Sequence, residues 1–187
     1  FTTAEEIPLT NASFDNWSQN DKNNKLWQPW GDGESSFWDT GNQGATTVGE
    51  SNSTPVTDTS NGSGKAASLE SKYIVIKFAA GNIFTGTYKK TDGTNGVLDF
   101  GRPFTSFPSK LRVHYKYNCA TIDKVGDDAM ASLKGRPDSC QIYIALTDWD
   151  APLEIRTRPS ERQLFDPNDS HVIAYGELTK GGSVTSY

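Results

Sequence analysis

The sequence is short of the residues that most often carry metal or nucleophilic chemistry. Its 187 residues include one Met, two Cys and two His. No Cys/His spacing suits zinc, and neither His114 nor His171 has the Ser or Cys context of a nucleophilic triad. No apolar run approaches the length of about 18 residues that a membrane-spanning helix needs. A net charge of −5 without a basic stripe argues against a nucleic-acid partner. We therefore expect no nucleic-acid binding and no direct membrane insertion of this segment.

What is present favours strands. A chain of 187 residues, taken as a single domain over residues 1–187, is long enough to bury a core. With 34% hydrophobic residues and one Met, that core must rely on aromatic and β-branched side chains, which are strand formers. The 17 Gly and 9 Pro are spread along the chain, as expected for many short strands joined by turns.

Hydrophobic alternation predicts where the strands lie. The expected strands are residues 66–78, 82–89, 97–100, 111–118, 140–147 and 172–178. Asp92-Gly93 and Asn95-Gly96 mark a tight turn between two of them. Residues 49–64 are predicted to be a surface loop, and residues 127–133 the one helical turn. No segment of ten or more residues has convincing helical periodicity, so the class is all-β, a sandwich or a barrel.

Three stretches place Trp beside a short carboxylate or amide, namely residues 13–17, 36–42 and 145–149. Indole rings stack on the apolar faces of a pyranose, while its hydroxyls need directed hydrogen bonds. The candidate ligand contacts are Trp38, Asp39, Asn42, Asp148 and Trp149. Alternatively, the Trp residues close the ends of a sandwich, and Asp39 and Asn42 satisfy backbone donors of the turn at Thr40 and Gly41.

A glycoside hydrolase would need two carboxylates held about 5 to 10 Å apart across a sugar ring. The pairs that the sequence offers are Asp148 with Asp150 and Asp39 with Glu70. Nothing in the sequence places either pair across a cleft, and no catalytic residue is assigned.

One set of oxygen ligands could hold calcium, which prefers carboxylate and carbonyl oxygens. Its candidates are Asp15, Asp166, Asn168 and Asp169. The alternative is an Asx-rich turn without an ion. No other cofactor is expected.

The two cysteines, Cys119 and Cys140, flank a polar loop and fall on the apolar faces of two predicted strands. Their sulfurs could therefore meet at the base of the loop. A disulfide there would stabilise the fold by about 3 kcal/mol and would imply an oxidising compartment. The alternative is a pair of reduced, buried thiols.

Six blocks in order give the chain a specific resemblance. They are residues 14–17 (FDNW), 37–42 (FWDTGN), 66–71 (AASLES), 79–86 (AAGNIFTG), 100–104 (FGRPF) and 165–169 (FDPND). From about residue 7 onward the chain resembles the Putative carbohydrate metabolism domain of gut Bacteroidetes.

The resemblance implies a jelly-roll sandwich similar to galactose-binding domains and carbohydrate-binding modules. It also implies export, commonly to the cell surface as part of a lipoprotein, with an extracellular, outer-membrane or periplasmic location. Domains of this type continue with further strands, so we expect a C-terminal segment that completes the sandwich. The pair of cysteines lies outside the family pattern.

Together these observations predict a non-catalytic carbohydrate-binding module of an exported or cell-surface protein, with a polysaccharide or oligosaccharide as its partner. Two other functions stay open at this point. One is a glycoside hydrolase with a carboxylate pair, and the other is a structural or assembly module of a surface lipoprotein.

Overall fold

The computed structural model describes residues 9–20, 24–75, 77–126 and 128–187, and this part of the chain is nearly all β. It contains twelve strands in antiparallel sheets, so the all-β prediction is confirmed. Helix is limited to α1 (Asn42–Ala45) and to the 3-10 turns η1 (Asp128–Leu133) and η2 (Pro159–Glu161). The predicted helical turn is thus confirmed as η1. None of the described helices is long and apolar enough to cross a membrane.

The chain forms two compact units. The first unit contains the residues up to Ser106 together with Trp149–Asp166, and the second contains Phe107–Asp148 and Pro167–Tyr187. Each unit is thus built from segments that are separate in the sequence. The prediction of a single domain with jelly-roll topology stays a prediction.

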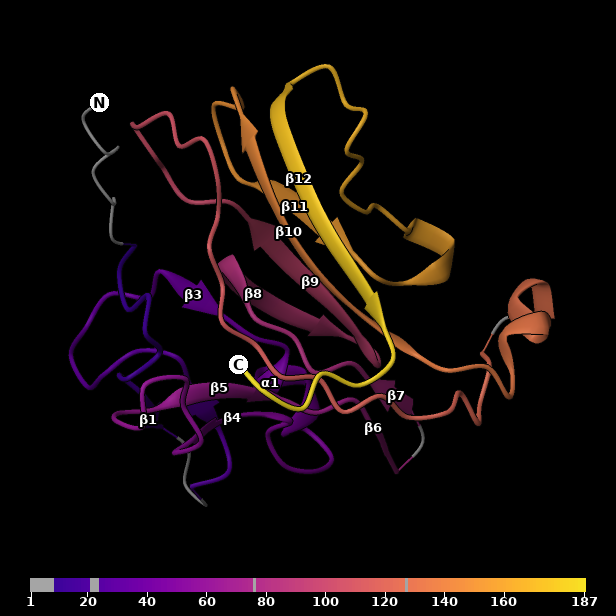
Figure 1. Cartoon of the computed structure of the whole chain (residues 1–187). Helices are drawn as coiled ribbons and strands as arrows, with labels where there is room; N and C mark the ends of the chain where they lie inside the picture. The colour runs from indigo at the N-terminus through magenta and orange to yellow at the C-terminus, as the bar shows by residue number, and fades with distance from the viewer. Residues whose placement is uncertain (1–8, 21–23, 76, 127) are drawn as a thin grey trace. The chain divides into compact units, whose positions relative to one another are not determined.

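The first unit is built on a four-stranded antiparallel sheet in the order β11-β9-β8-β3 (Figure 1). Its strands are β3 (Trp38–Asp39), β8 (Phe84–Asp92), β9 (Asn95–Phe100) and β11 (Leu153–Arg156). The predicted turn joins β8 to β9, where Asp92 pairs with Asn95 and Gly93 adopts a φ of 62°. That positive φ is why a glycine opens this turn.

Three two-stranded sheets complete the first unit. They are β1 (Ser18–Gln19) with β2 (Trp27–Gln28), β4 (Ser53–Val56) with β5 (Ala66–Leu69), and β6 (Lys72–Ile74) with β7 (Lys77–Ala79). The expected loop over residues 49–64 is wrong in part, because it contains β4. The single strand expected over residues 66–78 is also wrong, because the run is divided among β5, β6 and β7. Val75, at a φ of 51°, begins the turn that separates β6 from β7.

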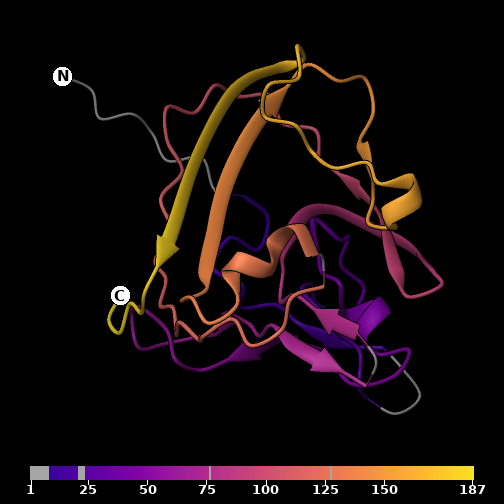
Figure 2. The same cartoon turned by 90° about the vertical axis from the view of Figure 1, so that its right-hand side faces the viewer.

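The second unit consists mainly of one long antiparallel pair, β10 (Ser139–Thr147) and β12 (Val172–Gly181). The two strands run side by side in both views (Figures 1 and 2), and both were predicted. The strand predicted over residues 111–118 is wrong. Its one ladder contact is the isolated bridge from Tyr117 to Val184. Alternation was present there, but a strand also needs a neighbour in register.

The buried core of the first unit is half polar. Its most buried apolar residues are Trp17, Ala45, Ile74, Tyr88, Val97 and Ile155. Beside them lie buried polar residues, namely Ser18, Asp39, Thr40, Asn42, Ser51, Asn52 and Ser53. Because short strands leave many backbone groups outside ladders, polar side chains inside the unit take over their hydrogen bonding.

Candidate functional site

Asp39, expected to contact a ligand, lies in the interior at 5% exposure. Its Oδ1 accepts the N–H of Thr40 at 2.8 Å, and its Oδ2 accepts the N–H of Tyr88 at 2.7 Å. Burial raises the pKa of Asp39, although both hydrogen bonds and the nearby Arg102 oppose that rise. The carboxylate therefore ties β3 to β8.

Asn42 is buried more deeply, at 1% exposure. Its Nδ2 donates to the carbonyls of Trp27 and Ser53, both at 2.7 Å. Its Oδ1 accepts the N–H groups of Asn52 and Ser53, both at 3.1 Å. An amide has two donors and two acceptor sites, so all four are in use. The structure therefore gives Asn42, like Asp39, a structural role and leaves neither side chain a polar atom for a sugar.

Trp38 is half-buried in a cluster of aromatic rings. Its ring meets Phe14 edge-on at a centroid distance of 5.1 Å, and Phe37 at 5.5 Å. Its indole N–H donates to the carbonyl of Thr10 at 2.8 Å. These contacts support the alternative in which Trp38 packs within the unit, and its role as a ligand contact stays a prediction.

Asp148 and Trp149 are neighbours in the chain but fall in different units. Trp149, in the first unit, is half-buried and meets Phe165 edge-on at 6.3 Å. Asp148, in the second unit, is exposed, and its Oδ1 lies 2.8 Å from Nδ1 of His171. The role of Trp149 as a ring that contacts a ligand stays a prediction.

Two of the four residues expected to bind calcium, Asp15 and Asp169, accept backbone hydrogen bonds in the structure. Oδ1 of Asp15 accepts the N–H of Lys65 at 2.6 Å, and hydrogen bonds from Ser13 and Lys65 lower its pKa. Oδ1 of Asp169 accepts the N–H of His171 at 2.8 Å, which is an Asx turn. Within the described ranges no three His, Cys, Asp or Glu side chains form a group that could hold a metal. Calcium binding by Asp15, Asp166, Asn168 and Asp169 stays a prediction.

Cys119 and Cys140 are both free thiols in the structure, so the expected disulfide is not formed. The Sγ of Cys119 donates to the carbonyl of Asp138 at 3.2 Å and approaches that of Ala120 at 3.5 Å. Its thiol is thus directed at backbone oxygen. The thiols are reduced, as in the alternative, but both side chains are half-buried and not buried as that alternative expected.

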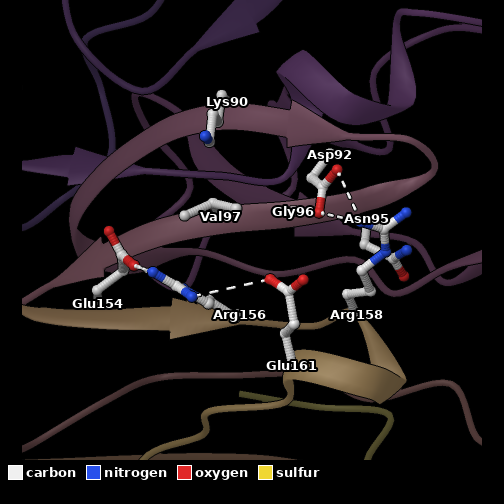
Figure 3. A pocket seen from close by; sticks show the side chains of 9 residues that line it. All are labelled: Lys90, Asp92, Asn95, Gly96, Val97, Glu154, Arg156, Arg158 and Glu161. Carbon is white, nitrogen blue, oxygen red and sulfur yellow. Dashed lines mark hydrogen bonds and ion pairs between the residues drawn. The ribbon is translucent and has the colours of Figure 1, made fainter.

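A pocket that was not predicted from the sequence lies on the first unit, beside the turn between β8 and β9 (Figure 3). It encloses about 160 Å³. Its lining residues are Lys90, Asp92, Asn95, Gly96, Val97, Glu154, Arg156, Arg158 and Glu161. The alternation of Glu154, Arg156 and Arg158 was the only signal in the sequence that could have pointed to it.

The carboxylates of this pocket are engaged in ion pairs. Glu154 lies 2.6 Å from Arg156 and 2.7 Å from Lys89, and Arg158 holds Asp92 at 3.1 Å. Hydrogen bonds from Lys89 and Arg156 lower the pKa of Glu154. A general acid of a glycosidase needs the opposite shift. Glu154 therefore does not have the raised pKa of a general acid.

A second feature is an exposed surface of the β10–β12 pair, here called the Tyr–Glu face. It consists of Gln141, Tyr143, Tyr175, Glu177 and Thr179. Tyr143 and Tyr175 are 36% and 38% exposed, with ring centroids 6.0 Å apart. Alternation along residues 140–147 predicted the β10 side of this face, but not the strand register that brings the second Tyr beside the first.

These features define an all-β protein with exposed aromatic and polar groups and without a catalytic constellation in its described part. The chain belongs to the family described as Putative carbohydrate metabolism domain, whose model matches residues 13–187. The match confirms the family inferred from the six sequence blocks, and it covers both compact units. No curated protein and no solved structure matches the chain.

Proposed function

We propose that this chain is a non-catalytic carbohydrate-binding domain of an exported or cell-surface protein, and that its ligand is a polysaccharide or oligosaccharide. Membership of a carbohydrate-related family supports the class of ligand. The observation that favours binding over catalysis is that the carboxylates of the pocket are paired with cations. Glu154 is paired with Lys89 and Arg156. Asp92 is paired with Arg158. Since the pKa of Glu154 is lowered by Lys89 and Arg156, Glu154 is a poor proton donor at neutral pH.

Weak affinity at one site suits such a domain. Stacking of one or two rings on aromatic side chains gives modest binding, which repeated sites on one polymer raise through multivalency. Trp149 is one proposed contact with the ligand. Its ring is half-buried, and the ring contact described for it, with Phe165, is edge-on.

The experiment combines a binding assay with an activity assay on the same panel of soluble polysaccharides. Affinity gel electrophoresis should retard the wild-type chain with at least one polysaccharide, while an assay of reducing ends should detect no hydrolysis. Glu154→Gln should bind as the wild type does, and Trp149→Ala should bind more weakly.

Two outcomes would overturn the proposal. Release of reducing ends that Glu154→Gln abolishes would establish a hydrolase. Failure of the wild-type chain to bind any polysaccharide on a glycan array would favour a structural or assembly module of a surface lipoprotein.

A further inference from the structure

We propose that the Tyr–Glu face is a carbohydrate-binding surface of this chain, separate from Trp149, and that it takes uncharged pyranose rings. This inference rests on the proposed function and adds a site and a class of glycan to it. None of the five residues was singled out in the sequence as a ligand contact.

The strand register gathers the face. Tyr143 lies directly opposite Glu177, and Gln141 lies opposite Thr179. Tyr175 is two positions from Glu177 along β12 and lies opposite Ala145. Side chains two residues apart on a strand share a face, so these groups all project to the same side of the pair. Ala145 contributes only a methyl group beside the ring of Tyr175.

The other side of the same pair is the apolar one. It carries Cys140, Ile142, Ile144 and Leu146 from β10, with Ala174 and Leu178 from β12. A strand pair with one apolar and one polar face normally directs the apolar face to a core. In this pair the two faces differ in polarity more than in exposure, since Leu178 on the apolar side is 44% exposed. The Tyr–Glu face is the polar side, and it carries both tyrosine rings.

The two rings offer a stacking surface. Their planes are inclined by 43° at a centroid distance of 6.0 Å, and each ring is more than a third exposed. A tyrosine presents an apolar ring face together with a polar hydroxyl, which matches the apolar faces and hydroxyl rim of a pyranose. Two rings at this spacing can contact one sugar or two linked ones.

Glu177 is held in place by three neighbours on the Tyr–Glu face. It accepts hydrogen bonds from Nε2 of Gln141 at 3.0 Å, from the Tyr175 hydroxyl at 2.6 Å and from the Thr179 hydroxyl. These three donors lower the pKa of Glu177 to about 2. The carboxylate is thus ordered and ionised before any ligand arrives, which reduces the cost of binding.

This arrangement selects the charge of the ligand. The protons of the Tyr175 and Thr179 hydroxyls point to Glu177, so the outward lone pairs of these oxygens are acceptors. Sugar hydroxyls are donors that fit such acceptors. A uronate or sulfate would face an ionised carboxylate, and the five residues of the face include no cation. The face therefore suits a neutral glycan.

The test uses the full chain and two kinds of probe, a neutral polysaccharide panel (a β-glucan and a galactomannan) and a uronic-acid polysaccharide (pectate). Binding is measured by affinity gel electrophoresis and calorimetry. The wild-type chain should bind a neutral member and should not bind pectate. Tyr175→Ala and Tyr143→Ala should each raise the Kd about tenfold or more, because each removes a stacking ring. Tyr175→Phe, which keeps the ring, should lose less.

The matched control is Tyr73→Ala, which removes a tyrosine that is 50% exposed on the first unit. It should leave the Kd unchanged within about twofold. Circular dichroism and the unfolding midpoint check that each variant is folded. If one alanine variant does not fold, the other alanine variant and Tyr175→Phe still test the face.

The outcomes separate this inference from the proposed function. If the wild type binds a neutral glycan and both Tyr variants retain its Kd, the site is wrong while the function stands. Preference for pectate would overturn the class of glycan. If the wild type binds no polysaccharide, the proposed function fails and this inference fails with it.

Discussion

At the scale of the residue, Asn42 shows how one side chain organises a region with few ladders. It hydrogen-bonds four backbone groups of three residues through both ends of its amide. The residue type was consistent with sugar contact or with backbone capping, and sequence could not choose between them. The choice depends on which backbone groups lie nearby, and those come from Trp27, Asn52 and Ser53, which are distant in sequence.

Replacing this amide tests its structural role. Asn42→Ala leaves buried backbone donors and acceptors without partners, each at a cost of about 1–3 kcal/mol. We expect the free energy of unfolding to fall by about 3 kcal/mol or more. Urea unfolding measures it, and the exposed neighbour change Gln43→Ala is the control. A loss below about 1 kcal/mol would contradict the role assigned to Asn42.

Glu177 gives a prediction about pH. Its pKa is lowered to about 2 in the folded chain from an ordinary value of 4.5. Since the folded pKa is depressed, its stabilisation is fully present above about pH 4.5 and is lost as pH falls towards 2. We expect the wild type to be more stable than Glu177→Gln by a constant margin from pH 7 to about 5, and that margin to shrink between about pH 4.5 and 2. Urea unfolding midpoints of both proteins across this range measure the margin. A margin independent of pH would show that the three donors do not hold the ionised form.

At the scale of the element, the β8–β9 pair depends on a glycine. Gly86 has a φ of 148°, and a Cβ placed there would lie 2.0 Å from the carbonyl oxygen of Asp99 on the neighbouring strand. Any side chain at this position would push β9 away from β8. The sequence shows a glycine in a strand, but only the pairing explains why it is required.

Gly86→Ala should therefore lower the free energy of unfolding by more than about 1 kcal/mol, since it combines a strained φ with a backbone clash. Gly176→Ala is the matched control. That glycine also lies within a strand, has no positive φ, and its added Cβ would make an ordinary 3.7 Å contact with Ile144. Thermal unfolding compares the two variants. Equal midpoints would refute the proposed close approach.

Strands were predicted correctly where a segment had apolar alternation and also pairs with a neighbouring strand in the structure. The pairs β8 with β9 and β10 with β12 fall close to the expected ranges. A turn signal supports the first pair, and regular alternation along β10 supports the second. The expected strand over residues 111–118 had alternation of the same quality. It fails because it lacks a paired neighbour, and pairing is not a property of the segment itself.

At the scale of the whole molecule, the first unit is closed by a segment that returns late in the chain. Residues 149–166 supply β11, which pairs with β9 and places Ile155 opposite Leu98. Ile155 is deeply buried, at 3% exposure. It anchors the returning segment to the sheet.

Ile155→Ala should lower the free energy of unfolding by about 2–5 kcal/mol, because it removes buried methyl groups and leaves a cavity. Leu164→Ala, at a position of the same segment that is 56% exposed, is the control and should change it by less than about 0.5 kcal/mol. Urea unfolding and limited proteolysis of residues 149–166 measure both. Equal sensitivity of the two positions would mean that the segment is not held through Ile155.

The sequence by itself determined the all-β class, the family and most long strands, because composition, turn residues and alternation are local properties. Only the tertiary structure decided which polar and aromatic side chains face inward. It placed Asp39 and Asn42 in the interior and brought Tyr143, Tyr175 and Glu177 to one face. The physical reason is that register and burial arise from pairing between distant segments, and a residue's chemistry becomes available only where that pairing leaves it exposed.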